Sequence, residues 1–394
     1  MKILYILNQF PRLYHTFILN DMIHLIEKNH DVFVLSMNKP HQSVVNNGVL
    51  PLVDKTFYLE DFMQHSDRFF QKYFVKVAQK LFFNNRSQKD YYTDFGSGIF
   101  ALRRIAHKIK EKKINIIHGA FGSEEATAAM TLSDMTGIHF SFETHAKDLF
   151  VHFRHSGEKI QKADKIFTIS DYNRQYLVNN LKCPSAKIIL KRVPFNKSYC
   201  DIIPDKPKKD NLVLSVCRLD PIKGLDCAIE AFKTVSQKYT SLNYLIIGDG
   251  PLKHQLVGKV KELSLDHKVT FLGDVTNEVA LDYVAQSTLV LLPSVVAPNG
   301  DRDGIPTSLI ESMYLKTPVI SSRVSGIPEL IEDGVNGFLT EPGNVNQLTE
   351  KMSELLSDKM LRVKMGEQAR ETIEKEFNVE KSTNLLINAW QEML

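Results

Sequence analysis

Eleven short apolar runs, separated by segments long enough to form helices, constrain the fold of this chain more than any other feature. The runs are rich in Ile, Val, Leu and Phe on both faces, which is typical of parallel strands buried between helices. We predict strands over residues 2–7, 31–37, 114–119, 139–145, 165–170, 187–193, 211–219, 242–248, 268–273, 288–294 and 317–322. The pattern predicts an α/β protein with two doubly wound parallel sheets.

The length of the chain favours two domains. At 394 residues it is longer than a single ordinary core supports. Residues 201–210 hold two prolines and six charged side chains, a composition typical of a linker. We therefore predict domains over residues 1–200 and 211–375. Open α/β sheets bind ligands beyond the carboxyl ends of their strands, so these ends are where functional residues are expected.

Charge is divided unevenly between the two halves. Residues 1–200 hold 28 Lys and Arg against 18 Asp and Glu, whereas the remainder holds 21 against 28. A basic half attracts lipid headgroups, a diphosphate-linked acceptor or nucleic acid, and an ordinary solvated surface explains it equally well. The four cysteines form no C-x-x-C pair, and no segment has the pattern of a signal peptide or a spanning helix. These features favour a reduced, cytoplasmic protein.

Two carboxylates eight residues apart, Asp303 and Glu311, flank the predicted start of a helix at Thr307. Gly304 relieves backbone crowding there, and Pro306 suits the first helical turn. The free N–H groups at a helix start bind anions, while carboxylates accept hydrogen bonds from hydroxyls. The element therefore predicts a site for a sugar nucleotide.

Two cations, Arg218 and Lys223, lie five residues apart where the strand predicted over 211–219 gives way to a helix. A guanidinium and an ammonium there grip a diphosphate and stabilise the negative charge on a departing nucleoside diphosphate. The alternative is a pair of surface charges.

These motifs together resemble the family 4 retaining glycosyltransferases of the bacterial exopolysaccharide and surface-glycan type. That family has the GT-B fold, in which two Rossmann-like domains with doubly wound parallel sheets face one another. The motifs that carry the resemblance lie at residues 218–219, 223–225, 246–251, 271–273, 303–311, 317–320, 326–330 and 336–339. Their order and spacing are specific, although each motif alone is weak.

The resemblance implies a donor site in the second domain. Arg218 and Lys223 are implied to bind the donor diphosphate, Asp303 the sugar hydroxyls and Glu311 the nucleotide ribose. The backbone of Gly304, Ile305 and Thr307 and the loop at Gly248 complete the implied donor-binding set. Asp303 stands where the family commonly has Glu, and Pro306 where it often has Gly, so the donor sugar is not identified by the motif.

The first half resembles the family through two further motifs. Residues 10–18 look like the F-P-x-x-S-E-T-F-I opening of such enzymes, with Tyr14 and His15 in place of Ser and Glu. Arg12, Tyr14 and His15 are the implied acceptor-binding residues; His15 as a partly exposed loop histidine is the alternative. His145 and Asp148 match H-x-x-D, which implies that His145 contacts the reacting sugar and that Asp148 supports its loop.

The implied reaction moves a hexosyl group from a nucleotide diphosphate sugar to a hydroxyl of a glycan acceptor, with retention at the anomeric carbon. The implied catalytic residues are His145, Asp303, Lys223 and Arg218. The acceptor is expected to be linked to polyprenyl diphosphate at the inner face of the cell membrane, and nucleic acid is not an expected partner. A sugar-nucleotide epimerase and a non-catalytic glycosyltransferase-like subunit are the alternatives.

Asp301, Arg302 and Asp303 spell D-x-D, the pattern with which another glycosyltransferase fold holds a divalent metal. Because it precedes a helix in the second α/β domain, we favour a metal-independent site without a cofactor. Gly248 and Gly250 suggest dinucleotide binding, but the third glycine of G-x-G-x-x-G is absent.

Two helical segments have expected partners. Residues 61–83 combine an aromatic face with four cations spaced by four, which predicts either a membrane-surface helix or a helix packed on the first domain. In the GT-B fold the last helix commonly crosses back to the first domain, so residues 376–394 are expected to pack there.

Overall fold

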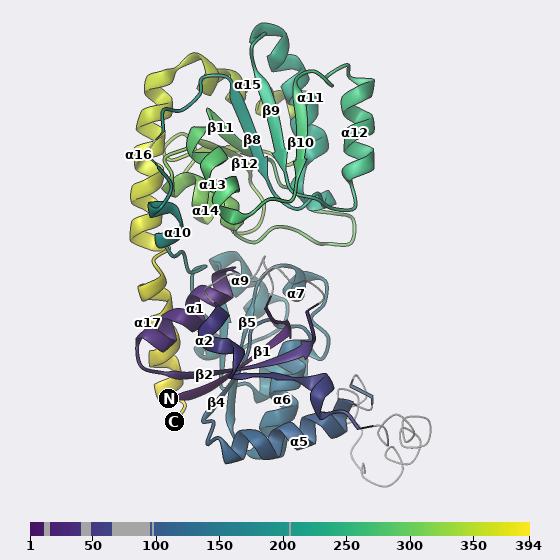
Figure 1. Cartoon of the computed structure of the whole chain (residues 1–394), viewed down its shortest axis with the longest axis vertical. Coiled ribbons are helices and arrows are strands. Elements are labelled where there is room, and N and C mark those ends of the chain that lie inside the picture. Colours follow the sequence, from purple (N-terminus) through teal and green to yellow (C-terminus); the bar gives the residue numbers. More distant parts are fainter. Residues whose placement is uncertain (12–15, 41–48, 65–94, 97, 205) are drawn as a thin grey trace. The chain divides into compact units, whose positions relative to one another are not determined.

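The computed structural model describes residues 1–11, 16–40, 49–64, 95–96, 98–204 and 206–394 (Figure 1). The chain forms two compact units. The first consists of Met1–Thr168, Asn173–Lys191 and Glu380–Leu394, and the second of Ile169–Tyr172 and Arg192–Val379. The chain therefore leaves the first unit at residue 191, ahead of the predicted linker at 201–210, and residues 380–394 belong to the first unit.

The first unit is built on a seven-stranded parallel sheet in the order β3-β2-β1-β4-β5-β6-β7. Its strands are β1 (Lys2–Gln9), β2 (Asp31–Asn38), β3 (Thr56–Tyr58), β4 (Ile116–Gly119), β5 (His139–Thr144), β6 (Lys165–Thr168) and β7 (Ile188–Leu190). Its helices are α1 (Thr16–Glu27), α2 (Leu50–Val53), η2 (Leu59–Phe62), α5 (Gly98–Glu111), α6 (Glu124–Thr136), α7 (Lys147–Phe150), α8 (Ser156–Lys162), α9 (Asp171–Asn179), η4 (Ser185–Lys187) and α17 (Val379–Gln391), the first residues of α9 and α17 lying in the second unit.

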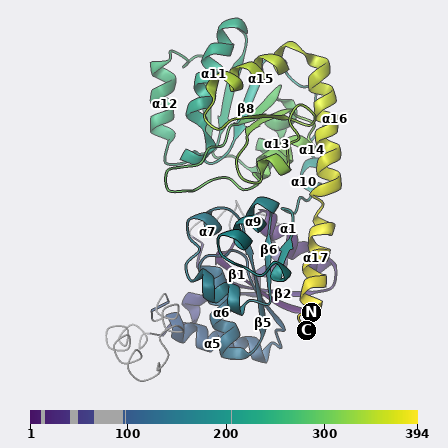
Figure 2. The ribbon, with the colours of Figure 1, turned by 180° about the vertical axis from the view of Figure 1, so that it is seen from behind.

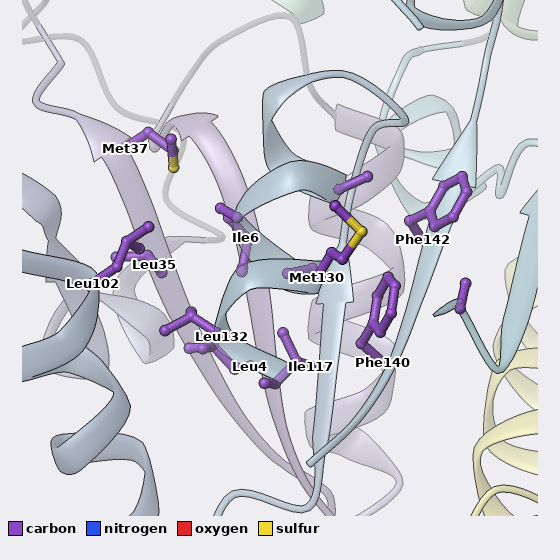
Figure 3. Packing of buried hydrophobic residues seen from close by; sticks show 14 of the residues in the cluster. Leu4, Ile6, Leu35, Met37, Leu102, Ile117, Met130, Leu132, Phe140 and Phe142 are labelled. Carbon is purple, nitrogen blue, oxygen red and sulfur yellow. The ribbon is translucent and has the colours of Figure 1, made fainter. Parts of the chain in front are cut away.

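Side chains of β1 alternate between two cores, one on each face of this sheet. Leu4 and Ile6 pack in a cluster that includes residues of α5 and α6 (Figure 3). Ile3 and Tyr5 point to the other face, where they join Trp390 of α17 and residues of α1. Both faces are covered, which explains why the strands read as continuous apolar runs.

The second unit has a six-stranded parallel sheet in the order β10-β9-β8-β11-β12-β13. Its strands are β8 (Leu212–Val216), β9 (Asn243–Ile247), β10 (Val269–Gly273), β11 (Leu289–Leu292), β12 (Val319–Ser322) and β13 (Phe338–Thr340). Its helices are α10 (Ser198–Asp201), η5 (Pro221–Lys223), α11 (Leu225–Lys238), α12 (Lys253–Glu262), α13 (Asn277–Gln286), α14 (Thr307–Tyr314), η6 (Ile327–Glu329), α15 (Val345–Ser357) and α16 (Lys359–Glu376). Figures 1 and 2 show α12 and α16 on opposite sides of this unit.

All eleven predicted strands are present, so the prediction of two parallel α/β sheets is confirmed. Some predicted strands extend past the end of the observed strand into the loop that follows. Residues 217–219, for example, follow β8 as a loop whose Leu219 N–H donates to the carbonyl of Asp249. The edge strands β3 and β13, of three residues each, were not predicted. Among the described residues, no helix combines the length and apolar composition of a membrane span.

Candidate active site

The strand order of the second unit brings two predicted loops together. β8 and β11 are neighbours in the sheet, although the chain forms β9 and β10 between them. Open α/β sheets bind ligands at such a switch point, because the connections on either side run to opposite faces of the sheet. Lys223 follows β8 and Asp303 follows β11, so both lie at this point of the sheet.

Lys223 and Asp303 form a buried ion pair there. Nζ of Lys223 lies 2.6 Å from Oδ1 of Asp303, and the side chains are 15% and 9% exposed. The Ser294 hydroxyl donates to Oδ2 of the same carboxylate at 2.6 Å. Burial lowers the pKa of Lys223, but the adjacent carboxylate outweighs burial and the pKa is raised. The ammonium is therefore charged at neutral pH, and the ion pair uses one of its three donors.

Two glycines allow the loops of this site to approach one another. A Cβ atom at Gly224 would lie 1.9 Å from the carbonyl oxygen of Pro293, and one at Gly248 would lie 2.0 Å from that of Cys217. Both glycines have positive φ, at 62° and 124°. Any other residue would separate the loops that follow β8, β9 and β11.

Arg218 extends from the loop after β8 toward solvent. Its side chain is 61% exposed, and its Nε lies 3.1 Å from Oδ2 of Asp220. An ion pair this exposed restrains a side chain weakly, so the guanidinium can turn toward an anionic ligand.

Helix α14 begins at Thr307, as predicted. Pro306 occupies the N-cap with φ −65° and ψ 126°, and no side chain caps the helix. Proline therefore precedes the first turn instead of lying within it. Gly304 and Ile305, which lead into the helix, are buried. The uncapped N–H groups of the first turn carry the positive end of the helix dipole, which favours an anion.

Glu311 lies one turn into α14 and is partly buried. Its carboxylate makes no hydrogen bond or ion pair with any residue that the structure describes. Burial raises the pKa of Glu311 to about 7. The group therefore changes charge near neutral pH, and it has unused acceptor capacity.

The three residues of the D-x-D sequence make hydrogen bonds and ion pairs within the protein. Arg302 donates from its guanidinium to the Tyr172 hydroxyl at 2.9 Å and to the carbonyl of Gly300 at 3.0 Å. Asp301 accepts from the N–H of Arg302, while Asp303 is engaged by Lys223 and Ser294. Within the described ranges, no group of three or more His, Cys, Asp or Glu side chains is arranged to hold a metal ion.

In the first unit, His145 lies directly after β5. Its N–H donates to the carboxylate of Asp148, which also accepts from the N–H of Gly122 at 2.7 Å. Asp148 therefore holds the loop that carries His145. The imidazole contacts the rings of Phe17 and Phe121, at centroid distances of 5.0 and 4.8 Å. Arg12, Tyr14 and His15, the predicted acceptor-binding residues, lie outside the described residues, and so does the predicted amphipathic segment from residue 65 onward.

The comparison with protein families decides the identity of the second unit. Residues 201–372 match the family of glycosyl transferases group 1. The chain is a glycosyltransferase with a group 1 domain in its second unit. The matched residues of this glycosyltransferase include Arg218, Lys223, Asp303 and Glu311, whereas His145 lies outside the match.

Relatives of this glycosyltransferase match nearly the whole chain, beyond the group 1 domain. It is 29% identical to the amylovoran biosynthesis glycosyltransferase AmsK of Erwinia amylovora over 404 residues, covering 96% of each chain. It is 25% identical to the putative colanic acid biosynthesis glycosyltransferase WcaL of Escherichia coli K12 over 394 residues, again covering 96% of each. The structure of Anabaena Alr3699/HepE in complex with UDP has a TM-score of 0.74, with 17% identity and full coverage of both chains. The predicted GT-B fold class is thus confirmed.

Three residues at or behind the predicted sites of the glycosyltransferase were not predicted themselves, and two of them contact predicted site residues. Ser294 bonds Asp303, and Glu143 lies beside His145. Lys191 in turn pairs with Glu143. Glu143 and Lys191 are charged residues inside two of the predicted apolar strands, and this mismatch is a sequence signal that they share with Lys187 and Arg192.

Proposed function

We propose that this glycosyltransferase moves a hexosyl group from a nucleotide diphosphate sugar to a hydroxyl of a glycan acceptor, with retention, in bacterial exopolysaccharide biosynthesis. The observation that carries the proposal is the buried Lys223–Asp303 pair at the switch point of the second sheet, beside the uncapped start of α14. The relatives named for amylovoran and colanic acid biosynthesis support the pathway class. The UDP complex of HepE supports a nucleoside diphosphate as the donor's leaving group.

Each residue of the site has a role in this proposal. Lys223 and Arg218 bind the donor diphosphate, and the N–H groups at Thr307 and the backbone around Gly304 and Ile305 contact the phosphate or sugar. Asp303 accepts from sugar hydroxyls with the oxygen lone pairs that its ion pair leaves unused. Glu311 accepts from ribose hydroxyls, because its carboxylate is otherwise unpartnered among the described residues.

The reaction exchanges one bond at the anomeric carbon for another. The bond from that carbon to the diphosphate oxygen breaks, a bond to the acceptor oxygen forms on the same face, and the acceptor proton passes to the departing phosphate. Positive charge from Lys223 and Arg218 stabilises the leaving group, since preorganised charge near a developing anion lowers the barrier. His145 bonds a substrate hydroxyl, and we propose that no divalent metal or other cofactor takes part.

A thermal-shift panel with UDP, GDP, ADP and dTDP, each with and without chelator, tests the donor site. A nucleoside diphosphate at 100 times its Kd stabilises the folded state by about 2.7 kcal/mol, which is several degrees in Tm. We expect one base to give a selective shift that survives chelator and is lost in K223A. No shift with any nucleotide contradicts the donor site, and a shift abolished by chelator contradicts metal independence.

Product analysis then tests the reaction. With the matching nucleotide sugar and a lipid-linked glycan acceptor, we expect extension of the acceptor with the anomeric configuration of the donor. Conversion of the nucleotide sugar without any acceptor would instead identify an epimerase. Cosedimentation with anionic liposomes at low salt tests the proposed site of action at the inner face of the cell membrane.

A further inference from the structure

Three charged side chains form a cluster within the core of the first unit: Asp21 of α1, Glu143 of β5 and Lys191, which follows β7. Lys191 has no exposed surface, and Asp21 and Glu143 are 3% and 4% exposed. Nζ of Lys191 lies 2.7 Å from Oδ2 of Asp21 and 3.1 Å from Oε2 of Glu143. Since desolvated charges are costly without partners, the two carboxylates are held in place by one ammonium.

Glu143 connects this cluster to His145. Its second carboxylate oxygen, Oε1, lies 3.4 Å from Nε2 of His145. Because Phe17 and Phe121 pack against the imidazole, the ring keeps this edge toward Glu143. Both ring nitrogens are buried, and neither meets hydrogen-bond geometry with a described residue; Nε2 faces the Glu143 carboxylate at 3.4 Å, whereas Nδ1 faces no described partner.

Protonation of His145 adds a second cation beside Glu143, which already contacts Lys191, while burial raises the pKa of Asp21 despite its contact with Lys191. The titratable groups near the imidazole are Glu143 of β5, Asp148 of α7, Lys191 after β7 and His118 of β4, with Asp21 of α1 behind Lys191. Burial lowers the pKa of His145, but the two acids outweigh burial and Lys191, and the pKa is raised. His118 is neutral, because burial lowers its pKa to about 3.

We propose that Glu143 is a positioning residue that holds a proton on Nε2 of His145 and so leaves Nδ1 as the ring nitrogen for a substrate hydroxyl. Lys191 keeps Glu143 in this orientation. An ammonium only donates hydrogen bonds, so Lys191 requires an oxygen from residue 143. This inference rests on the proposed function, because it assigns the means by which His145 meets its substrate.

The E143Q variant should reverse which ring nitrogen of His145 carries the proton, while the side chain at position 143 keeps its size and shape. Its carboxamide must turn the oxygen toward Lys191, which brings the NH2 group to Nε2 of His145. Nε2 then has to accept, and the proton of the neutral ring moves to Nδ1. We expect kcat to fall by about 100-fold, while UDP binding stays unchanged because the proposed donor residues lie in the second unit.

Nitrogen-15 NMR of the full chain with labelled histidine reads the proton position directly, with the His145 signals assigned by their loss in H145Q. In the wild type we expect the neutral ring to carry its proton on Nε2; in E143Q we expect the proton on Nδ1 and titration at lower pH. The matched control is S382A, which removes a hydroxyl that contacts Lys191 at 3.4 Å and donates to Asp21 at 3.2 Å; it leaves Glu143 unchanged and should leave the proton on Nε2.

A wild-type ring with its proton on Nδ1 overturns the inference, even if E143Q does not fold. An E143Q variant that lowers Tm but keeps the proton on Nε2 also overturns it, and shows that Glu143 is only structural. Absence of sugar transfer by the wild type contradicts the proposed function instead, since the NMR measurement does not depend on turnover.

Discussion

The two units use buried charge in opposite ways. In the first, Lys191 is fully enclosed between Asp21 and Glu143, and its partners are all side chains of the same unit. In the second, Lys223 and Asp303 are paired, but Arg218 is exposed, and the Glu311 carboxylate has no partner in the described part of the chain. This contrast fits the two proposals, in which the closed cluster orients His145 and the site with unused donors and acceptors binds the donor.

Removal of Lys191 should have the largest effect. K191M leaves two buried carboxylates without their cation, and breaking a buried ion pair in this way costs about 3–5 kcal/mol. We expect this loss in urea unfolding of the first unit, followed by near-UV circular dichroism at its Trp390. K28A is the control, because Lys28 of the same unit pairs with the exposed Glu380 and its loss should cost less than about 1 kcal/mol. Equal losses in the two variants would contradict a special role for the enclosed cluster.

Removal of Lys223 should act on transfer more than on folding. K223A takes away a cation poised for the leaving diphosphate, so we expect kcat/KM to fall by about 10²–10³-fold, with the circular dichroism spectrum retained. K253A is the matched control, because the exposed pair of Lys253 with Asp249 lies in the same unit outside the proposed diphosphate contacts. Near-normal turnover by K223A would refute the proposed donor site.

The hydroxyl of Ser294 tests whether the orientation of Asp303 matters. S294A removes a hydrogen bond to a charged group, which is worth about 1.5 kcal/mol or more, so kcat/KM should fall by about tenfold. S321A is the control, because Ser321 is equally buried but donates to the carbonyl of Leu292. An equal loss in S321A would assign the effect to packing.

The smallest effect is a pH dependence through Glu311. Its pKa of about 7 lies above its ordinary value, so its contribution to the stability of the ligand-free protein is present at low pH and is lost as the pH rises toward 7. UDP affinity should change in the opposite direction, because the ionised carboxylate accepts ribose hydroxyls better. We expect calorimetry to show tighter binding at pH 8 than at pH 6 by up to about tenfold, relative to E311Q. Parallel pH profiles in wild type and E311Q would exclude this role.

Local patterns in the sequence predict most of the strands and part of the candidate site. The apolar runs predict the eleven strands, and the residues before Thr307 predict the start of α14. The sequence does not show which charged residues meet, because Asp21 and Lys191 are 170 residues apart and pair only when α1 packs on the folded sheet. The hydrogen bond of Ser294 is also not visible in the sequence. Its partner, Asp303, lies nine residues later in the loop after β11, and only the folded loop brings the two together.

The core of the first unit is assembled from pieces made at different times during translation. Trp390 has no exposed surface and donates to the Ser141 hydroxyl at 2.9 Å, and Ser382 bonds Asp21. Between Lys191 and Glu380 the ribosome adds the 188 residues of 192–379, which takes about 10–40 s at usual rates. The apolar face that Trp390 covers in the folded unit therefore lacks α17 until the second unit has been synthesised.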